Sequence, residues 1–123
     1  MDTIIQACSR THTLLAGDGY REVNYQRVLA YYLQESGFRV SLEQVCVYQF
    51  GPINAGSGRM DIVAYRDSQQ FIVELKVGGI SKLADHMSQL RRYVKHQPGS
   101  TGLLVIFRNE QAPFFKRIGN SPP

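Results

Sequence analysis

The stretch RMDIVAYRDSQQFIVELK at residues 59–76 decides the fold. Two runs rich in β-branched and aromatic residues, at 62–66 and 69–73, predict two strands that fold back on each other. Between them, Asp67-Ser68 supplies residues typical of a tight turn. The sequence therefore predicts an antiparallel hairpin at this point of the chain.

This hairpin predicts where three charged side chains lie. Asp61 and Glu74 are equally far from the turn, so the pairing sets their carboxylates directly opposite each other. The two-residue period of a strand puts Lys76 on the same face as Glu74. Facing carboxylates repel unless a cation lies between them, and a divalent ion with oxygen ligands is such a cation. We therefore expect a metal-dependent phosphodiester-cleaving centre, with a simple ion pair between Asp61 and Lys76 as the alternative.

Length and composition describe an ordinary globular chain with a basic bias. The 123 residues are 43% hydrophobic and 20% charged, which predicts one domain, residues 1–123, with a single core. The formal net charge of +4 and the pI near 9.3 favour an anionic partner, although such an excess also serves solubility alone.

The sequence also limits the expected compartment. Cys8 and Cys46 are too few and too far apart for a zinc site or a disulfide framework, so we expect both to be reduced and buried. No apolar run approaches the roughly 18 residues of a membrane span, and the N-terminus lacks the layout of a signal peptide. These observations predict an intracellular protein, in the cytoplasm or the nucleus, without membrane contact.

Hydrophobic periodicity predicts three helices. The first is short and is capped by Asp2 or Thr3. The second runs from about residue 20 to 36 with Asp18 as its cap, and Glu22 extends its buried stripe by one turn. The third runs from about residue 81 to 96 and buries a stripe of its own.

Two further strands complete the expected elements. Residues 44–50 (QVCVYQF) precede the hairpin, and residues 102–107 (GLLVIF) form a continuously apolar strand expected inside the sheet. Residues 51–58 are expected to form a mobile glycine-rich loop leading to Asp61, since they lack the ending of a nucleotide-binding loop. Residues 112–123 are expected to form a loosely attached tail, in which packing of Phe114 and Phe115 is left open. This order predicts an α/β fold in which helices flank a mixed central sheet, whose last two strands are joined by a helical crossover.

Residues 19–25 read GYREVNY and match a Gly-x-x-Glu-x-x-Tyr signature through Gly19, Glu22 and Tyr25. The chain thereby resembles the GxxExxY proteins, a branch of the PD-(D/E)XK nuclease superfamily. Further motifs of that family are matched, in order along the chain, by His12, Asp61, Glu74-Leu75-Lys76 and Gln89.

The resemblance extends over nearly the whole chain. Residues 102–107 resemble the family's last core strand, and residues 115–118 resemble its usual ending. Met60 stands where the superfamily name has proline, a position that shapes only the backbone before Asp61. The resemblance implies a restriction-endonuclease-like core and a magnesium-dependent endonuclease activity.

The resemblance and the chemistry of phosphodiester hydrolysis together imply a role for each site residue. Mg²⁺, or Mn²⁺ in its place, would be held by oxygens of Asp61, Glu74 and Leu75 (its carbonyl), and Glu22 would hold a second metal or a metal-bound water. Lys76 would orient the attacking water, stabilise charge or act as a base. Gln89 would contact Glu22, Lys76 or a phosphate.

Three of these residues also have a simpler interpretation. Glu22 is a first-turn carboxylate of the kind that the helix dipole favours. Gln89 borders the apolar stripe of its helix and is equally well a surface residue. His12 lies at helical spacing from apolar residues, where a hydrogen-bonded boundary histidine is more common than a ligand.

Basic residues indicate how a nucleic acid would be held. The candidates are Arg59, which precedes Met60, and four residues of the expected third helix: Lys82, Arg91, Arg92 and Lys95. These side chains either contact a phosphate backbone or form a solvated face.

The sequence thus predicts a nuclease-like domain that hydrolyses DNA phosphodiester bonds. One alternative is a module that keeps the fold and binds nucleic acid or protein without turnover. Another is a small subunit of a larger complex. A homodimer is also open, because so small a chain encloses little of a duplex.

Overall fold

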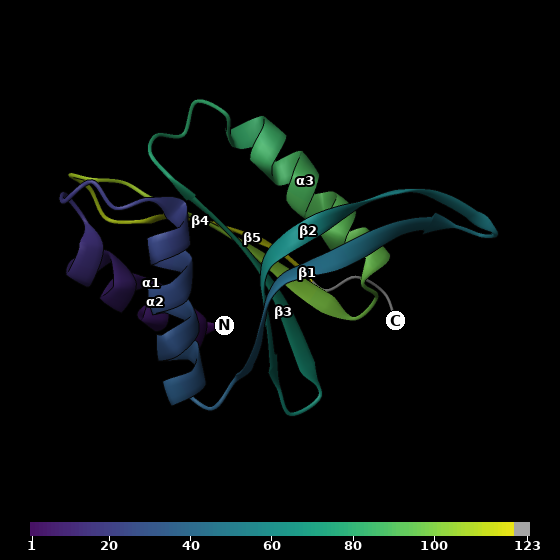
Figure 1. Cartoon of the computed structure of the whole chain (residues 1–123), viewed down its shortest axis with the longest axis horizontal. Coiled ribbons are helices and arrows are strands. Elements are labelled where there is room, and N and C mark those ends of the chain that lie inside the picture. The colour runs from purple at the N-terminus through teal and green to yellow at the C-terminus, as the bar shows by residue number, and fades with distance from the viewer. Residues whose placement is uncertain (120–123) are drawn as a thin grey trace.

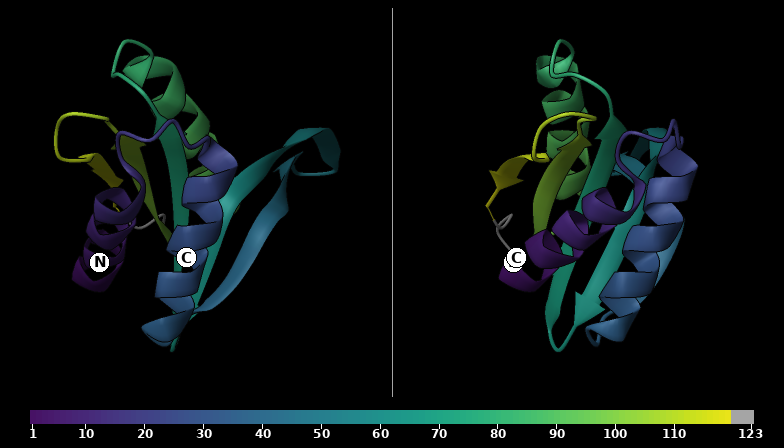
Figure 2. Two further views of the ribbon diagram at one scale, coloured as in Figure 1. Left: turned by 60° about the vertical axis from the view of Figure 1, so that its left-hand side comes forward. Right: turned by 90° about the vertical axis from the view of Figure 1, so that its left-hand side faces the viewer.

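The computed structural model describes residues 1–119, which form a mixed five-stranded sheet with helices on both faces (Figure 1). The elements follow in the order α1 (Asp2–Leu15), α2 (Glu22–Glu35), β1 (Arg39–Phe50), β2 (Ile53–Arg66), β3 (Gln69–Val77), α3 (Leu83–His96), β4 (Ser100–Phe107) and β5 (Phe114–Ile118). Helices α1 and α2 lie on one face of the sheet, and α3 lies on the other (Figure 2). The predicted α/β fold is confirmed. No helix in the described part of the chain is long and apolar enough to cross a membrane.

The strands run side by side in the order β1-β2-β3-β4-β5. β3 and β4 are parallel and α3 connects them, as predicted for the crossover, while the other neighbours are antiparallel. Every residue of β4 is buried, because this strand lies between two others and has helices over both faces. The continuously apolar strand predicted from the sequence is therefore an interior strand of the sheet.

The hairpin between β2 and β3 has the predicted register. Its residue pairs run from Ile62 with Val73 to Arg66 with Gln69. The turn residue Asp67 has a positive φ of 57°, a left-handed conformation that Asp tolerates better than most residues. The acidic residues just beyond the paired region are consequently brought together at the open end of the hairpin.

The segment at residues 51–58, expected to be a mobile loop, is instead part of a second and longer hairpin. β1 continues to Phe50 and β2 begins at Ile53, with only Gly51 and Pro52 between them. Gly51 has a positive φ of 59°, which suits a two-residue hairpin turn. The loop prediction was wrong because small residues have a weak strand propensity of their own, which pairing with the neighbouring strand overrides.

The outer part of this hairpin, residues 44–60, projects from the body of the protein and is called the arm below (Figure 1). The arm changes direction where it leaves the sheet. Met60 and Val63 both pack in the core on the α3 side, although strict alternation would put residues three apart on opposite faces. The alternation of side chains along β2 is therefore shifted by one residue between Met60 and Val63. As a result, the inner side of the arm packs toward α3.

Part of the expected loose tail is an edge strand. Residues of β5 pair antiparallel with β4, and the side chains alternate between the two cores. Phe114 and Ile118 pack on the α3 side, whereas Phe115 packs on the side of α1 and α2. Such alternation is the ordinary pattern of a strand, so the tail prediction was wrong for these residues. Its last four residues, 120–123, lie outside the described part of the chain.

The helix starts differ from the expected ones. Met1 occupies the cap position of α1 without a side-chain hydrogen bond, so neither Asp2 nor Thr3 is the cap. At α2, the backbone N–H of Arg21 donates to Oδ1 of Asn24 at 2.9 Å, and Asp18 has no part in this contact. α1 thus begins without a capping side chain, whereas the start of α2 is held by the Asn24 side chain in place of the expected Asp18.

His12 ties α1 to the end of β4. Its Nε2–H donates to the carbonyl oxygen of Arg108 at 2.5 Å, and its ring stacks on Phe107 with centroids 6.4 Å apart. The side chain is half-buried and its hydrogen bond is satisfied. His12 is therefore a boundary histidine with a structural contact, which was the simpler of its two interpretations.

Helix α3 packs closely on β4 at Gly102. A Cβ atom at this position would lie 2.8 Å from Cγ2 of Val94 and 3.1 Å from side-chain atoms of Leu90. Such distances are far below ordinary van der Waals contact, so only glycine lets the helix lie this close to the strand.

Candidate functional site

Asp61 and Glu74 meet at the open end of the β2–β3 hairpin. The backbone N–H of Asp61 donates to Oε1 of Glu74 at 2.8 Å. The backbone N–H of Leu75 donates in turn to Oδ2 of Asp61 at 3.0 Å. Each carboxylate is therefore fixed by the backbone of the other strand, which locks both side chains in one arrangement.

Burial and mutual repulsion make ionisation of this pair costly. Glu74 is only 1% exposed, and burial, followed by the charge of Asp61, raises its pKa from 4.5 to about 8. Burial also raises the pKa of Asp61, against the lowering effects of the Leu75 N–H and the Lys76 charge. At neutral pH the isolated pair consequently retains a proton, which a cation would displace.

Lys76 lies close to both acids and is half-buried. Its positive charge lowers the pKa of Asp61 and of Glu74, although less than burial raises them. The same charge helps to lower the pKa of His86 on α3, after the larger effect of burial. The negative charge of Glu22 acts on His86 in the opposite direction, so residues from α2, β3 and α3 influence one another here.

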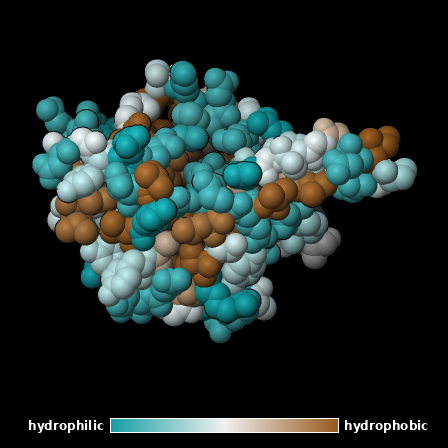
Figure 3. Space-filling view, viewed as in Figure 1, coloured by the Kyte–Doolittle hydropathy of each residue, from teal (hydrophilic) through white to brown (hydrophobic). Residues whose placement is uncertain are grey.

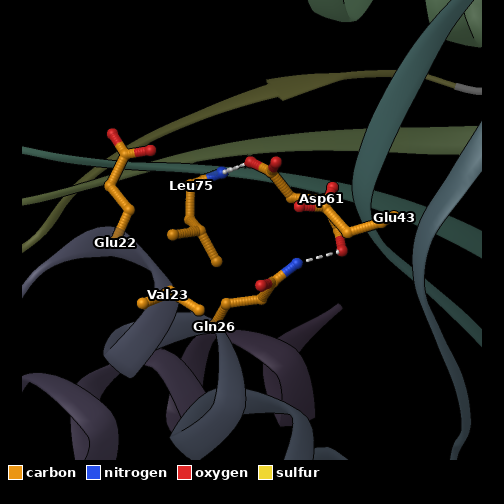
Figure 4. A pocket seen from close by; sticks show the side chains of 6 residues that line it. All are labelled: Glu22, Val23, Gln26, Glu43, Asp61 and Leu75. Carbon is orange, nitrogen blue, oxygen red and sulfur yellow. Dashed lines mark hydrogen bonds between the residues drawn. The ribbon is translucent and has the colours of Figure 1, made fainter.

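A cavity of about 250 Å³ opens between α2 and the bases of β1, β2 and β3. Figure 4 shows the six residues that line it: Glu22, Val23, Gln26, Glu43, Asp61 and Leu75. Glu22 is the first residue of α2, so its carboxylate lies at the positive end of the helix. One turn later, Nε2 of Gln26 donates to the carbonyl oxygen of Asp61 at 2.7 Å. The N-terminal turns of α2 thus form one wall of the cavity and are attached to the hairpin.

Glu43 contributes a further carboxylate, which the sequence did not predict. Its neighbours Leu42 and Gln44 pair with Ile62 and Met60, so Glu43 stands opposite Asp61 in the strand pair. Its charge raises the pKa of Asp61 further. Glu43 has a positive φ of 55°, a strained conformation for a residue with a Cβ, and such strain is concentrated at functional sites.

Gln89 does not reach the acids. Its Nε2 donates to the hydroxyl of Tyr93 at 3.0 Å, and that hydroxyl donates to the carbonyl oxygen of Arg59 at 2.9 Å. These hydrogen bonds run from α3 to the arm and not to Glu22 or Lys76, while contact of Gln89 with a phosphate stays a prediction. In the structure, Gln89 supports the position of the arm.

The predicted basic residues are all exposed. Arg59 lies on the arm, Lys82 directly precedes α3, and the remaining three lie on α3 itself: Arg91, Arg92 and Lys95. Nζ of Lys95 lies 5.2 Å from the centre of the Phe50 ring at the end of the arm. Contact of these side chains with phosphate stays a prediction.

Three residues near the acids were missed by sequence reasoning. Gln26 lies four residues after Glu22, so helical spacing could have placed it on the same face. His86 precedes Gln89 by one helical turn, and the same spacing argument applies. Glu43 could not be found this way, since a register shift between Val47 and Gln49 changes the pairing of β1 with β2.

The donor set fits a hard divalent cation with few protein ligands. In residues 1–119, no three Asp, Glu, His or Cys side chains come close enough to form a ligand cluster. Glu74 is buried and Asp61 is half-buried, and burial is the main cause of the raised pKa of each carboxyl. Magnesium is commonly held by one or two carboxylates, with waters and substrate phosphates completing its octahedron. Two facing carboxylates therefore suffice for such an ion.

Comparison with solved structures gives two matches. The crystal structure of a protein called SSO0001 is 20% identical, with a TM-score of 0.55, and the match covers 98% of this chain and 66% of that one. A Holliday junction resolvase, Hjc from Archaeoglobus fulgidus, is 18% identical with a TM-score of 0.45, and the match covers 76% of this chain and 81% of that one. The chain thus spans slightly less than two thirds of the length of SSO0001. At these identities the likeness concerns the fold alone.

Comparison with sequences assigns the family. No curated protein matches the chain. A family described as the PD-(D/E)XK nuclease superfamily matches residues 1–118, which include both core acids, the lysine and all the described strands. The restriction-endonuclease-like core expected from the sequence agrees with this match. The chain therefore belongs to the PD-(D/E)XK nuclease superfamily.

Proposed function

We propose that this chain is a magnesium-dependent endonuclease that hydrolyses DNA phosphodiester bonds at the Asp61–Glu74–Lys76 site. The observation that carries the proposal is the acid pair of buried Glu74 and half-buried Asp61, fixed by reciprocal backbone hydrogen bonds and beside a lysine. A fold gains no stability from two facing carboxylates with raised pKa values, so their placement favours a function. Nucleases of this superfamily generally use divalent metal ions, which agrees with the donor set.

Each residue has a proposed task. Asp61 and Glu74 hold the cation, which supplies Lewis-acid stabilisation of the charge that develops on the phosphate. Lys76 orients the attacking water or neutralises negative charge on the phosphate. Glu22 and Glu43 line the same cavity as Asp61 and would hold water molecules close to the acid pair. The Leu75 carbonyl is a further candidate oxygen ligand.

DNA is the proposed substrate because the chain carries a formal net charge of +4 and exposes basic side chains on α3 and on the arm. Such a surface attracts a phosphate backbone without regard to sequence. A homodimer or a larger assembly would let so small a chain act on both strands of a duplex. An intracellular location agrees with this substrate and stays part of the proposal.

The test is cleavage of supercoiled plasmid by the purified protein in Mg²⁺ or Mn²⁺, with single-stranded RNA of equal length as a competing substrate. Asp61→Asn and Lys76→Met are the diagnostic variants, because each is close in size to the residue that it replaces. We expect nicking that both substitutions abolish. Cleavage that survives both changes would assign the activity to a contaminant. Tight DNA binding without cleavage in either metal would instead favour a binding module that keeps only the fold.

A further inference from the structure

The arm exposes apolar side chains at its end. Ile53 is 62% exposed and Phe50 is 48% exposed, and Val45 and Val47 are also exposed further along β1. Figure 3 shows hydrophobic residues at the end of the arm and along its lower side. Exposed apolar side chains gathered on one projecting element usually mark a surface for interaction.

The arm also carries no negative charge. Residues 44–60 contain no Asp or Glu, and their one charged side chain is Arg59. Lys95 of α3 adds a positive charge next to the ring of Phe50. Exposed edge strands are usually protected by charged residues, and this one is not. An apolar surface that carries no negative charge of its own suits the bases and phosphates of a nucleic acid.

Aromatic contacts with α3 fix the direction of the arm. The ring of Tyr48 stacks on Tyr93 with centroids 6.5 Å apart, and Phe50 meets His96 edge-on at 4.9 Å. Gly58 permits this approach, since a Cβ atom there would lie 2.7 Å from Cε1 of Tyr93. An element that is already oriented loses little conformational entropy when it binds.

The same strand, β2, forms part of the arm and carries Asp61 of the acid pair. β2 runs from Ile53 at the end of the arm to Asp61 at its base. At 3.3 Å per residue this part of the strand spans about 26 Å. A duplex rises 3.4 Å per base pair, so the same length corresponds to about eight base pairs.

We infer that the arm is a second contact for duplex DNA, in which Pro52 and Ile53 insert between bases about eight base pairs from the acid pair. Apolar side chains inserted at a base step partly unstack it and bend the duplex. Lys95, beside the ring of Phe50, and Arg59, near the base of the arm, neutralise phosphates of the same duplex. The inference rests on the proposed function for the position of the DNA, and it adds a contact that acts in binding rather than in hydrolysis.

The test uses Ile53→Ser and a matched control, Leu14→Ser on α1, where the leucine is 57% exposed. Both proteins bind a fluorescent duplex of about 30 base pairs in Ca²⁺, which holds the site without supporting rapid cleavage. A second duplex series carries 2-aminopurine at successive positions, since its fluorescence rises when the base unstacks. Light scattering of each protein alone measures the oligomeric state.

We expect Ile53→Ser to weaken binding about tenfold and to remove a 2-aminopurine signal centred about eight base pairs from the cleavage position. Leu14→Ser should bind within twofold of the unchanged protein. Equal affinity for Ile53→Ser, or no binding of duplex DNA by any form, would overturn the inference. So would conversion of a dimer into a monomer by Ile53→Ser, because the arm would then contact a second copy of the chain.

In this design, rejection of the arm contact and rejection of the proposed nuclease activity give different results. Loss of affinity in Ile53→Ser from a protein that never cleaves DNA would support the arm contact and reject the nuclease. Cleavage that is equal in Ile53→Ser and in the unchanged protein, with equal affinity, would reject the arm contact and leave the nuclease intact.

Discussion

The backbone N–H of Asp61 donates to Glu74 while the carboxylate of Asp61 accepts from the N–H of the residue after Glu74. The two acids therefore hold each other's strands as well as facing each other. Because of this double attachment, the effect of the negative charge can be measured separately from the effect of the hydrogen bond to the backbone. An amide in place of either carboxylate keeps an oxygen acceptor for the backbone N–H, but it removes the negative charge.

Asp61→Asn and Glu74→Gln should each lower metal-dependent DNA cleavage by at least a hundredfold, because an amide is a poor ligand for magnesium. The free energy of unfolding should stay equal or rise, since the raised pKa values mean that both charges are costly to bury. Cleavage assays and urea denaturation measure the two effects. Glu110→Gln, at an exposed carboxylate, is the control. A variant that loses activity and stability together would point to a structural role.

The stability of the metal-free protein should fall as the pH rises from about 5 to about 8. Glu74 has an ordinary pKa of 4.5 in the unfolded chain and one of about 8 in the folded chain. Between these values the folded state binds the proton more tightly, so stability is greatest at the acidic end and is lost as the folded carboxyl ionises. Urea denaturation in EDTA at several pH values measures this slope.

Glu74→Gln should flatten that slope, because the substituted side chain has no proton to lose. Added Mg²⁺ should restore stability to the unchanged protein at pH 8 and have little effect on the variant. An identical slope in both proteins would show that other groups control the pH dependence.

Glu43→Gly should stabilise the protein by about 0.5–1 kcal/mol, since glycine adopts the positive φ of 55° without strain. The same change should lower cleavage if the Glu43 carboxylate assists at the site. Glu43→Gln keeps the strain and removes the charge, so it should leave stability nearly unchanged. Thermal unfolding compares the three proteins, and a destabilised glycine variant would contradict the strain argument.

Gly58→Ala should destabilise the protein by about 1–3 kcal/mol, the usual cost of forcing an extra carbon into a packed contact. The new Cβ would lie 2.7 Å from Cε1 of the buried Tyr93 and would push the arm away from α3. Gly79→Ala is the control, because a Cβ there meets nothing within 4 Å. Differential scanning fluorimetry should show a lower melting temperature for the first variant only.

The parts of the fold with strong local patterns could be predicted from the sequence. The β2–β3 register follows from its short turn, since a one-residue slip would expose the apolar face. β4 followed from its continuous apolar run, and the helical crossover followed from the spacing between β3 and β4. These are cases in which local propensity and tertiary packing favour the same structure.

The arm and β5 depend on pairing between distant residues, and no local pattern reveals them. Residues 54–58 contain small side chains that form a strand only because β1 lies beside them. The position of Glu43 depends further on a register shift within that pair. At the candidate site, the meeting of Asp61 and Glu74 followed from strand periodicity, whereas the contact between Gln89 and Tyr93 depends on how α3 lies across the sheet.

Gly102 gives β4 an influence over a region that it does not touch. Because α3 rests directly on this glycine, any larger residue would lift the helix, and with it the tyrosine whose hydroxyl holds the main chain at Arg59. Gly102→Ala should therefore impair the proposed DNA cleavage by displacing α3, without altering any residue of the candidate site itself. Inherited or engineered changes at this remote position would mimic active-site lesions.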